Sequence, residues 1–173
     1  TSPVSLSLSG DLSAEATTLY LNATAAGITF VSEGDSFASG VTMALDGAIG
    51  ADFGTNRYTL SKLNLSVNSV KAALDGWVEM AGDDIVTDIV LDCSDNDFKS
   101  ILSLVPALYT KDFKNLTASG DVSLTGAVKG RLSGDRYPAF NLKLNVANGR
   151  FKYADLPKAV SDINIVAAVN NGG

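Results

Sequence analysis

Hydrophobic and polar residues alternate with a period of two along most of this chain. Alternation of this kind predicts β-strands that bury one face, because successive side chains of a strand point to opposite sides. The clearest runs are Val4–Leu8, Leu63–Val67, Val70–Met80, Ile85–Leu91, Phe140–Val146 and Ile163–Val169. Counting the shorter runs as well, the pattern predicts roughly ten to twelve strands.

Short polar segments rich in glycine separate these runs. They are EGDS near Gly34, GTN near Gly54, AGDD near Gly82, SGDRYP before Pro138 and ANG at Gly149. Segments of this length and composition form hairpin turns, which join antiparallel neighbours. The chain therefore predicts an antiparallel meander rather than βαβ units.

Glycines also lie inside the alternating runs. Gly47 and Gly76 each follow Leu-Asp, and the alternation continues beyond them. The pentad SGDLS at Ser9 returns as SGDVS at Ser119, through either chance or a duplicated strand–bend–strand module. Because glycine within a strand marks a bend or a bulge, we expect a strongly bent sheet. The predicted fold class is mainly β: an antiparallel, strongly curved sheet or partly open barrel with one packed α-helix.

One segment, from Asp97 to about Leu108, has helical rather than strand-like spacing. Ser94 or Asp95 is the expected N-cap, and Pro106 is expected to end or kink the helix. The segment predicts a helix that packs on the sheet; the alternatives are a helix that gates an opening or one that binds a partner. The apolar stripe consists of Phe98, Ile101, Leu102, Val105 and Leu108.

The composition fits one folded domain over residues 1–173. The 173 residues are 46% hydrophobic and 18% charged, which leaves enough apolar surface for a folded β domain. The net charge is −6 without a basic cluster, so nucleic acid and anionic membrane surfaces are disfavoured partners. Both ends look cut, and we expect a fragment of a larger protein: glycine-punctuated β repeats over 1–95, then a helix plus β region over 96–173.

Residues suited to catalysis or metal binding are scarce. Histidine is absent, and Cys93 is the single cysteine, which excludes an internal disulfide and points to a partly buried thiol at a strand end. The stretch GAIGADFG lacks the ending of a phosphate loop, and DCSDNDF lacks the glycine and glutamate of a calcium loop. We expect no catalytic residues, no metal, no cofactor and no enzymatic activity. Trp77 has the opposite phase to Val78 and Met80 and should lie on the other face, partly buried.

The C-terminal 75 or so residues resemble the C-terminal part of the AsmA family, in the form found in Bacteroidetes-type envelope proteins. The matching pieces, in order, are ILSLVPALYTKDF, LTASGDVSLTGAVKG, YPAFNLKLNVANGRFKYADLPKAV and DINIVAAV. The first 95 residues are similar only in their glycine-punctuated β style.

The resemblance implies a non-enzymatic module of a periplasmic protein, anchored in the inner membrane of a Gram-negative bacterium and involved in outer-membrane assembly and phospholipid transport or homeostasis. It also implies a curved β-sheet with an apolar groove for phospholipid acyl chains. Contact with a membrane would come only through an N-terminal anchor outside this sequence, and neighbouring β segments of the parent chain would be partners. The alternatives are an adhesive or structural β domain of a large exported surface protein and, disfavoured by the lack of histidine, a hydrolase.

Two strand runs are the candidate lining of such a lipid groove. Their apolar residues are Leu63, Leu65, Val67, Leu142, Leu144 and Val146. Ligand sites for lipids are concave and mostly apolar, which suits these residues if their face is open. The alternative is a closed core, with the same residues buried under the Asp97–Leu108 helix.

Overall fold

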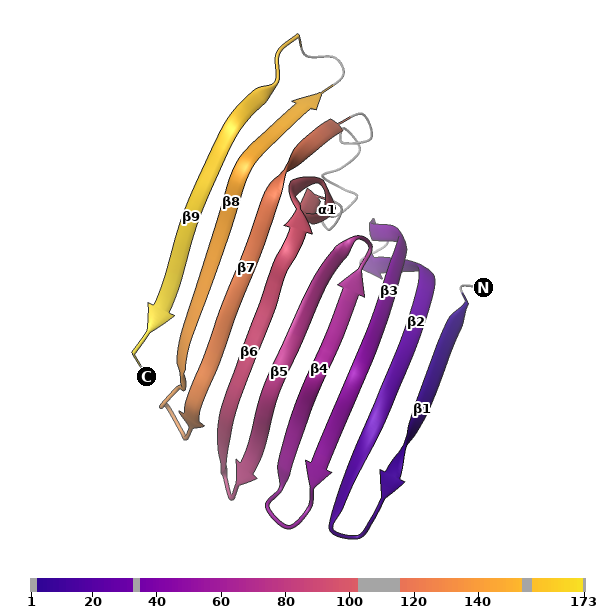
Figure 1. The fold of residues 1–173 in the computed structure, drawn as a ribbon, viewed down its shortest axis with the longest axis vertical. Coiled ribbons are helices and arrows are strands. Elements are labelled where there is room, and N and C mark those ends of the chain that lie inside the picture. Colours follow the sequence, from indigo (N-terminus) through magenta and orange to yellow (C-terminus); the bar gives the residue numbers. More distant parts are fainter. Residues whose placement is uncertain (1–2, 33–34, 103–115, 154–156, 173) are drawn as a thin grey trace.

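The computed structural model describes residues 3–32, 35–102, 116–153 and 157–172, with the backbone alone for 30–32, 35–39 and 102. These residues form one antiparallel sheet and one short helix (Figure 1). The strands are β1 (Val4–Leu12), β2 (Ala16–Ser32), β3 (Asp35–Asp52), β4 (Arg57–Val67), β5 (Val70–Ala81), β6 (Asp84–Asp97), β7 (Leu116–Leu132), β8 (Ala139–Tyr153) and β9 (Val160–Asn171); the helix is α1 (Phe98–Leu102).

Every strand pairs with its neighbours in sequence, in the order β1 to β9, and the sheet does not close into a barrel. The predicted mainly-β antiparallel meander is confirmed. The described residues form nine strands rather than ten to twelve, because short runs separated by Gly27 or Gly149 belong to single long strands, β2 and β8. The turns near Gly54, Gly82 and Pro138 are confirmed, and the segment around Gly34 lies partly outside the described residues.

The turn predicted at ANG is wrong, because Asn148 and Gly149 lie within β8. The pairing register shifts here on both sides of β8, between Val146 and Gly149 towards β9 and opposite Gly120 towards β7. Asn148 has a φ of 53°, the left-handed conformation that a bulge residue adopts. The segment therefore bends one long strand instead of reversing the chain.

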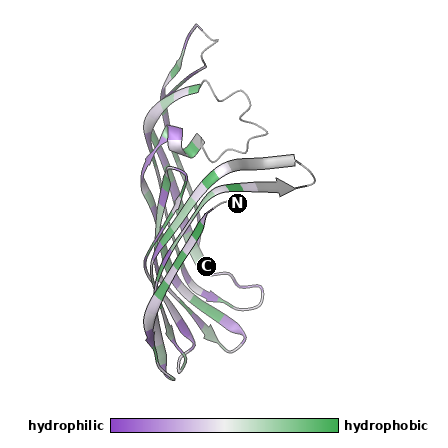
Figure 2. Ribbon diagram, turned by 90° about the vertical axis from the view of Figure 1, so that its right-hand side faces the viewer, coloured by the Kyte–Doolittle hydropathy of each residue, from purple (hydrophilic) through white to green (hydrophobic). Residues whose placement is uncertain are grey.

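The sheet curves strongly along its strands, as the profile in Figure 2 shows. Interior glycines permit this curvature. Gly76 has a φ of 136°, and a Cβ atom there would lie 2.0 Å from the carbonyl oxygen of Asp88 on β6. A Cβ atom at Gly47 would lie 2.7 Å from Leu63 on β4, and one at Gly120 would lie 2.7 Å from Gly149 on β8. Only glycine allows the neighbouring backbones to approach this closely.

Helix α1 follows β6 directly and contacts β6 and β7 near the ends of these strands (Figure 1). The amide of Ser100 donates to Asp97 Oδ1 at 2.6 Å, so Asp97 is the N-cap. The expected caps, Ser94 and Asp95, lie instead in an irregular part of β6, where the register shifts between Cys93 and Asn96. The described helix is five residues long, and the rest of the predicted Asp97–Leu108 helix lies outside the described residues.

A one-layer sheet leaves few residues fully enclosed. Among the side chains that the structure describes, the buried hydrophobic ones are Val41, Val122 and Val146. Val122 on β7 and Val146 on β8 pair with each other, and β7 is one of the two strands that α1 contacts. Stability therefore rests on long strand ladders and on side-chain contacts between neighbouring strands rather than on an enclosed core.

Candidate functional site

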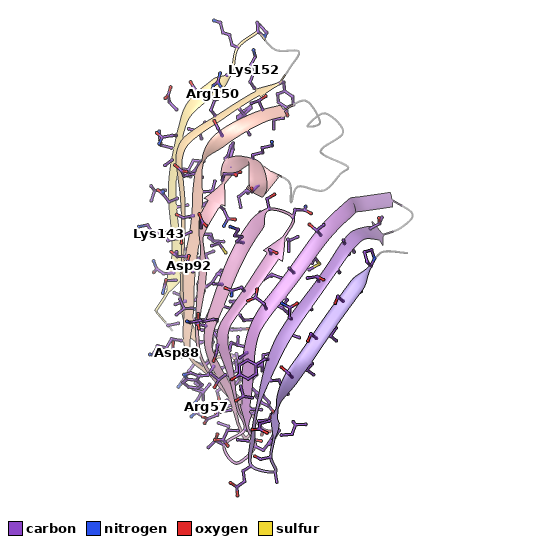
Figure 3. All side chains as sticks on the ribbon, turned by 45° about the vertical axis from the view of Figure 1, so that its right-hand side comes forward. Arg57, Asp88, Asp92, Lys143, Arg150 and Lys152 are labelled. Atoms are coloured by element: carbon purple, nitrogen blue, oxygen red, sulfur yellow. The ribbon has the colours of Figure 1, made fainter. Side chains whose placement is uncertain are left out.

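The two faces of the sheet differ in chemistry. Figure 3 shows Lys143, Asp92 and Asp88 projecting from the outer, convex side of the curve. Because side chains alternate along a strand, Leu142 and Leu144 project from the inner side, on which α1 also lies (Figures 2 and 3). We call this inner side the concave face and define its members by the pairing register.

Apolar residues pair with apolar residues at most positions of the concave face. One row begins with Leu6, Ala23, Leu45 and Leu65 on β1 to β4. A second begins with Leu63, Leu74 and Leu91 and continues through Gly126, Leu142 and Val169 to the other edge. Cross-strand pairs of this kind hold neighbouring strands together. The concave face is thus one continuous apolar surface from β1 to β9.

The structure places all six residues predicted to line a groove on this concave face. Leu63, Leu65 and Val67 belong to β4, and Leu142, Leu144 and Val146 belong to β8. The two sets do not touch, because β5, β6 and β7 separate them. They are joined by the intervening apolar residues of the same rows. Sequence reasoning left out of the lining the apolar residues that the other seven strands contribute to the same face.

Much of this surface is accessible. Leu6 is 66% exposed on the edge strand β1, and Leu142 is 40% exposed on β8. Val146, which also lies on β8, is only 5% exposed. Further large apolar residues that are exposed on the concave face are Val4, Leu8, Leu12, Met80, Val128, Phe140, Val160, Ile165 and Val169. Large contiguous apolar patches that are exposed on a protein surface often mark interaction sites.

The helix residues predicted to cover the face are placed only in part. Phe98 and Ile101 are half-buried in α1, Leu102 is described by its backbone alone, and Val105 and Leu108 lie outside the described residues. Helix α1 sits at one end of the sheet, against β6 and β7. Within the described part of the chain, the concave face is therefore not enclosed as a core under this helix.

The convex face carries the charged strand residues, several of which pair across strands, together with exposed Tyr20, Val90 and Val166. Arg57 binds Glu79 at 2.7 Å between β4 and β5, and its guanidinium lies 4.0 Å from the centre of the Trp77 ring. Trp77 is half-buried on this face, as its phase predicted. Two further pairs join β6 and β7: Lys129 with Asp88 at 2.6 Å and Arg131 with Asp84 at 2.7 Å.

Cys93 is a free, half-buried thiol near the end of the regular part of β6. Burial, together with the neighbouring Asp92 carboxylate, raises the pKa of the Cys93 thiol. The thiol is therefore protonated at neutral pH and a poor nucleophile, which agrees with the expected structural role.

A hollow of about 440 Å³ opens where β5 and β6 separate. Its lining combines apolar side chains such as Leu65 with the carboxylates of Asp46, Asp92 and Asp95. Asp92 accepts hydrogen bonds from the side chain and amide of Ser94, which lower its pKa, and Asp95 lies 3.8 Å from the exposed Lys71 ammonium. Asp46 accepts from Asn64 Nδ2 at 3.1 Å, so each of the three carboxylates has a partner within the chain, and the described residues contain no cluster suited to a metal ion.

Asn96 is a structural residue that sequence reasoning missed. Its buried amide replaces the missing ladder between β5 and β6: Nδ2 donates to the carbonyls of Lys71 and Cys93 at 2.9 Å, and Oδ1 accepts from the Lys71 amide at 2.8 Å. Nothing in the local sequence distinguishes Asn96 from the asparagines exposed on the surface, because its role depends on a strand that lies 25 residues away.

No protein-family model matches the chain, and neither a curated protein nor a solved structure matches it significantly. In the part of the chain that the structure describes, no helix has the length and apolar character needed to span a bilayer.

Proposed function

We propose that this chain is a lipid-carrying module of an AsmA-like envelope protein, and that its concave face shelters hydrocarbon chains from water. The proposal includes the periplasmic location, the inner-membrane anchoring of the parent protein and the involvement in outer-membrane assembly that the resemblance implies. In this role the chain needs no catalytic group.

The observation that carries the proposal is the distribution of charge between the two faces. At the paired strand positions whose side chains the structure describes, no Asp, Glu, Lys or Arg lies on the concave face, whereas the convex face holds Arg57, Asp88, Lys129 and Lys143. A surface without fixed charge complements an uncharged hydrocarbon chain, and burying the two against each other contributes roughly 25 cal/mol per Å² of apolar area.

The dimensions of the concave face also suit lipid chains. Nine strands at about 4.8 Å spacing give a breadth on the order of 38 Å. The acyl chains of one bilayer leaflet span roughly 15 Å, half the thickness of the hydrocarbon core. The apolar rows are therefore longer than a single acyl chain, and the curvature along the strands tilts successive rows towards one another, so that they could surround one side of it.

The two edge strands suit the neighbouring β segments expected as partners. Every residue of β1 is exposed, and β9 is exposed along most of its length. Edge strands present unpaired backbone groups, and natural proteins usually block them with charges, prolines or covering elements. Within Val4–Ser9 the edge has no such charge or proline, and the apolar side chains Val4, Leu6 and Leu8 extend the concave face to the border.

Native mass spectrometry after delipidation tests the proposal. We expect the delipidated protein to take up one or more phospholipids, and to enhance the emission of a fluorescent fatty acid. A protein that takes up neither, or that dimerises through its concave face instead, would count against a lipid module and leave the structural or adhesive β domain as the better reading.

Paired variants place the binding on one face. Leu144→Asp and Asn145→Asp each add one negative charge at adjacent positions of β8, on the concave and convex face respectively. We expect Leu144→Asp to weaken fatty-acid binding at least tenfold and Asn145→Asp to change it less than twofold. Since Leu144 also supports the fold, Leu8→Asp and Ser9→Asp on the exposed strand β1 provide a second pair.

A further inference from the structure

Several polar side chains on the concave face are already used to hold the sheet together, whereas Tyr58, which is 39% exposed, adds a single hydroxyl to this face. The hydroxyl of Thr17 donates to the Asp11 carbonyl at 2.6 Å, and that of Thr87 donates to the Trp77 carbonyl at 3.2 Å. Asn171 Oδ1 accepts from the Phe140 amide at 2.6 Å. Asn96 makes the three bonds described above. These groups have their hydrogen bonds within the protein.

The charged side chains described next lie on the convex face and point away from the concave face. Glu79, Asp88 and Asp84 each accept from a cation on the neighbouring strand. Arg150, Lys152 and Lys143 project from the outer side of the curve (Figure 3). At the paired strand positions that the structure describes, a lipid headgroup above the concave face would therefore meet neither a fixed charge nor a set of converging donors.

Resting on the proposed lipid function, we infer that this face selects the hydrocarbon chain and is indifferent to the headgroup. Strong discrimination between polar ligands requires polar groups that are left unpaired by the wrong ligand, or charges that repel it. The described strand positions of the concave face offer no charge and no converging set of polar groups. Affinity should therefore follow chain length, by about two- to fourfold for each buried methylene, while zwitterionic and anionic lipids with the same chains bind alike.

Competition against a bound fluorescent fatty acid measures this selectivity. The competitors are dihexanoyl and dioctanoyl phosphatidylcholine and phosphatidylglycerol, each below its micelle concentration. The protein carries a net charge of −6, which repels anionic lipids at long range; comparing them at about 0.5 M salt reduces that effect. We expect the two dioctanoyl lipids to compete within threefold of each other and the dihexanoyl lipids to compete at least tenfold more weakly.

The possible outcomes separate the two proposals. If the fluorescent fatty acid does not bind at all, the lipid function itself fails. If it binds, and one headgroup competes more than tenfold better than the other at high salt, the lipid function stands and headgroup indifference is wrong. If it binds and chain length has no effect, the lipid function also stands, but selection of the hydrocarbon chain is wrong.

A matched pair of variants can introduce the selectivity that the natural face lacks. Leu142→Lys adds a cation to the concave face at a position that is 40% exposed, and Asn141→Lys adds the same charge to the convex face of β8. At about 0.05 M salt we expect Leu142→Lys to shift the preference towards phosphatidylglycerol at least fivefold, and Asn141→Lys less than twofold. Equal shifts in both variants would overturn the inference, because the headgroup would then not lie over the concave face.

Discussion

The concave and convex faces belong to the same nine strands, yet their stabilisation differs. The convex face places small polar residues and cross-strand ion pairs in water, with contacts such as Arg57–Glu79 that can be broken one at a time. The concave face crowds apolar side chains and glycines together as the sheet bends. A change in residue size should therefore matter most on the concave face, and a change in charge or salt should matter on the convex face.

Adding a methyl group to one glycine on each face gives the largest contrast. Gly76→Ala should lower the free energy of unfolding by about 2–5 kcal/mol, because its Cβ would collide with the β6 backbone and its φ of 136° is strained for alanine. Gly50 lies on the convex face, where the nearest atom to an added Cβ is 3.6 Å away. Gly50→Ala should leave stability unchanged or raise it by up to about 1 kcal/mol.

Urea unfolding followed by circular dichroism measures both changes. If Gly76→Ala and Gly50→Ala have the same midpoint, then glycine is not required for the curvature at Gly76, and the steric difference between the faces is refuted.

Removing one amide from each face gives the next contrast. Asn96→Ala should cost about 2–4 kcal/mol, because it leaves buried polar groups of Lys71 and Cys93 without their partner. Asn64 is exposed on the convex face, where it donates to Asp46 at 3.1 Å, so Asn64→Ala should cost less than about 0.5 kcal/mol. Hydrogen exchange should show increased opening of β5 against β6 in Asn96→Ala; unchanged exchange there would argue against a bridging role.

Removing the Arg57 side chain should have a smaller effect. Arg57→Ala breaks both the ion pair with Glu79 and the contact with Trp77, at a cost of about 0.5–1.5 kcal/mol. Trp77 is the single tryptophan, so its fluorescence reports on this site alone. We expect emission at longer wavelength in Arg57→Ala, and little change in the control Arg131→Ala. An unaltered spectrum would mean that Arg57 does not shield the ring.

The smallest expected effect is a dependence of stability on pH. Hydrogen bonds from Ser133 and Arg131 lower the pKa of Asp84 from its ordinary value of 3.8. A lowered pKa in the folded state contributes stability above the ordinary pKa, and that stability is lost as pH falls through the folded value. Asp84→Asn should thus reduce stability at pH 6, and the difference from wild type should shrink between pH 5 and pH 3. The control is Asp83→Asn, in the same turn; an effect of Asp84→Asn that does not vary with pH would exclude this linkage.

The alternation in the sequence was enough to predict the sheet and the relative faces of residues within each unbroken run. A period of two fixes relative orientation within a strand, which is why Trp77 and Val78 were assigned to opposite faces and the six lining residues to one. The same alternation arises whether the apolar face is enclosed or open. The exposure of Leu6 and Leu142 therefore could not be read from the pattern.

Other features escaped prediction because one local signal serves two structures. Asn148-Gly149 suits a hairpin turn, yet a bulge inside a strand needs the same left-handed residue, and only pairing with β7 and β9 decides between them. In the same way, Ser94 and Asp95 are good N-cap residues that are used in the irregular end of β6, which leaves Asp97 to cap α1.

The meander topology has a consequence for how such a molecule can change in size. Each strand depends only on the strands before and after it in the chain, so folding can proceed by successive addition of neighbours, as in repeat proteins. Inserting or deleting one hairpin would lengthen or shorten the sheet by two strands without altering any other register. The capacity of the concave face could thus be adjusted in units of about 10 Å, the width of two strands.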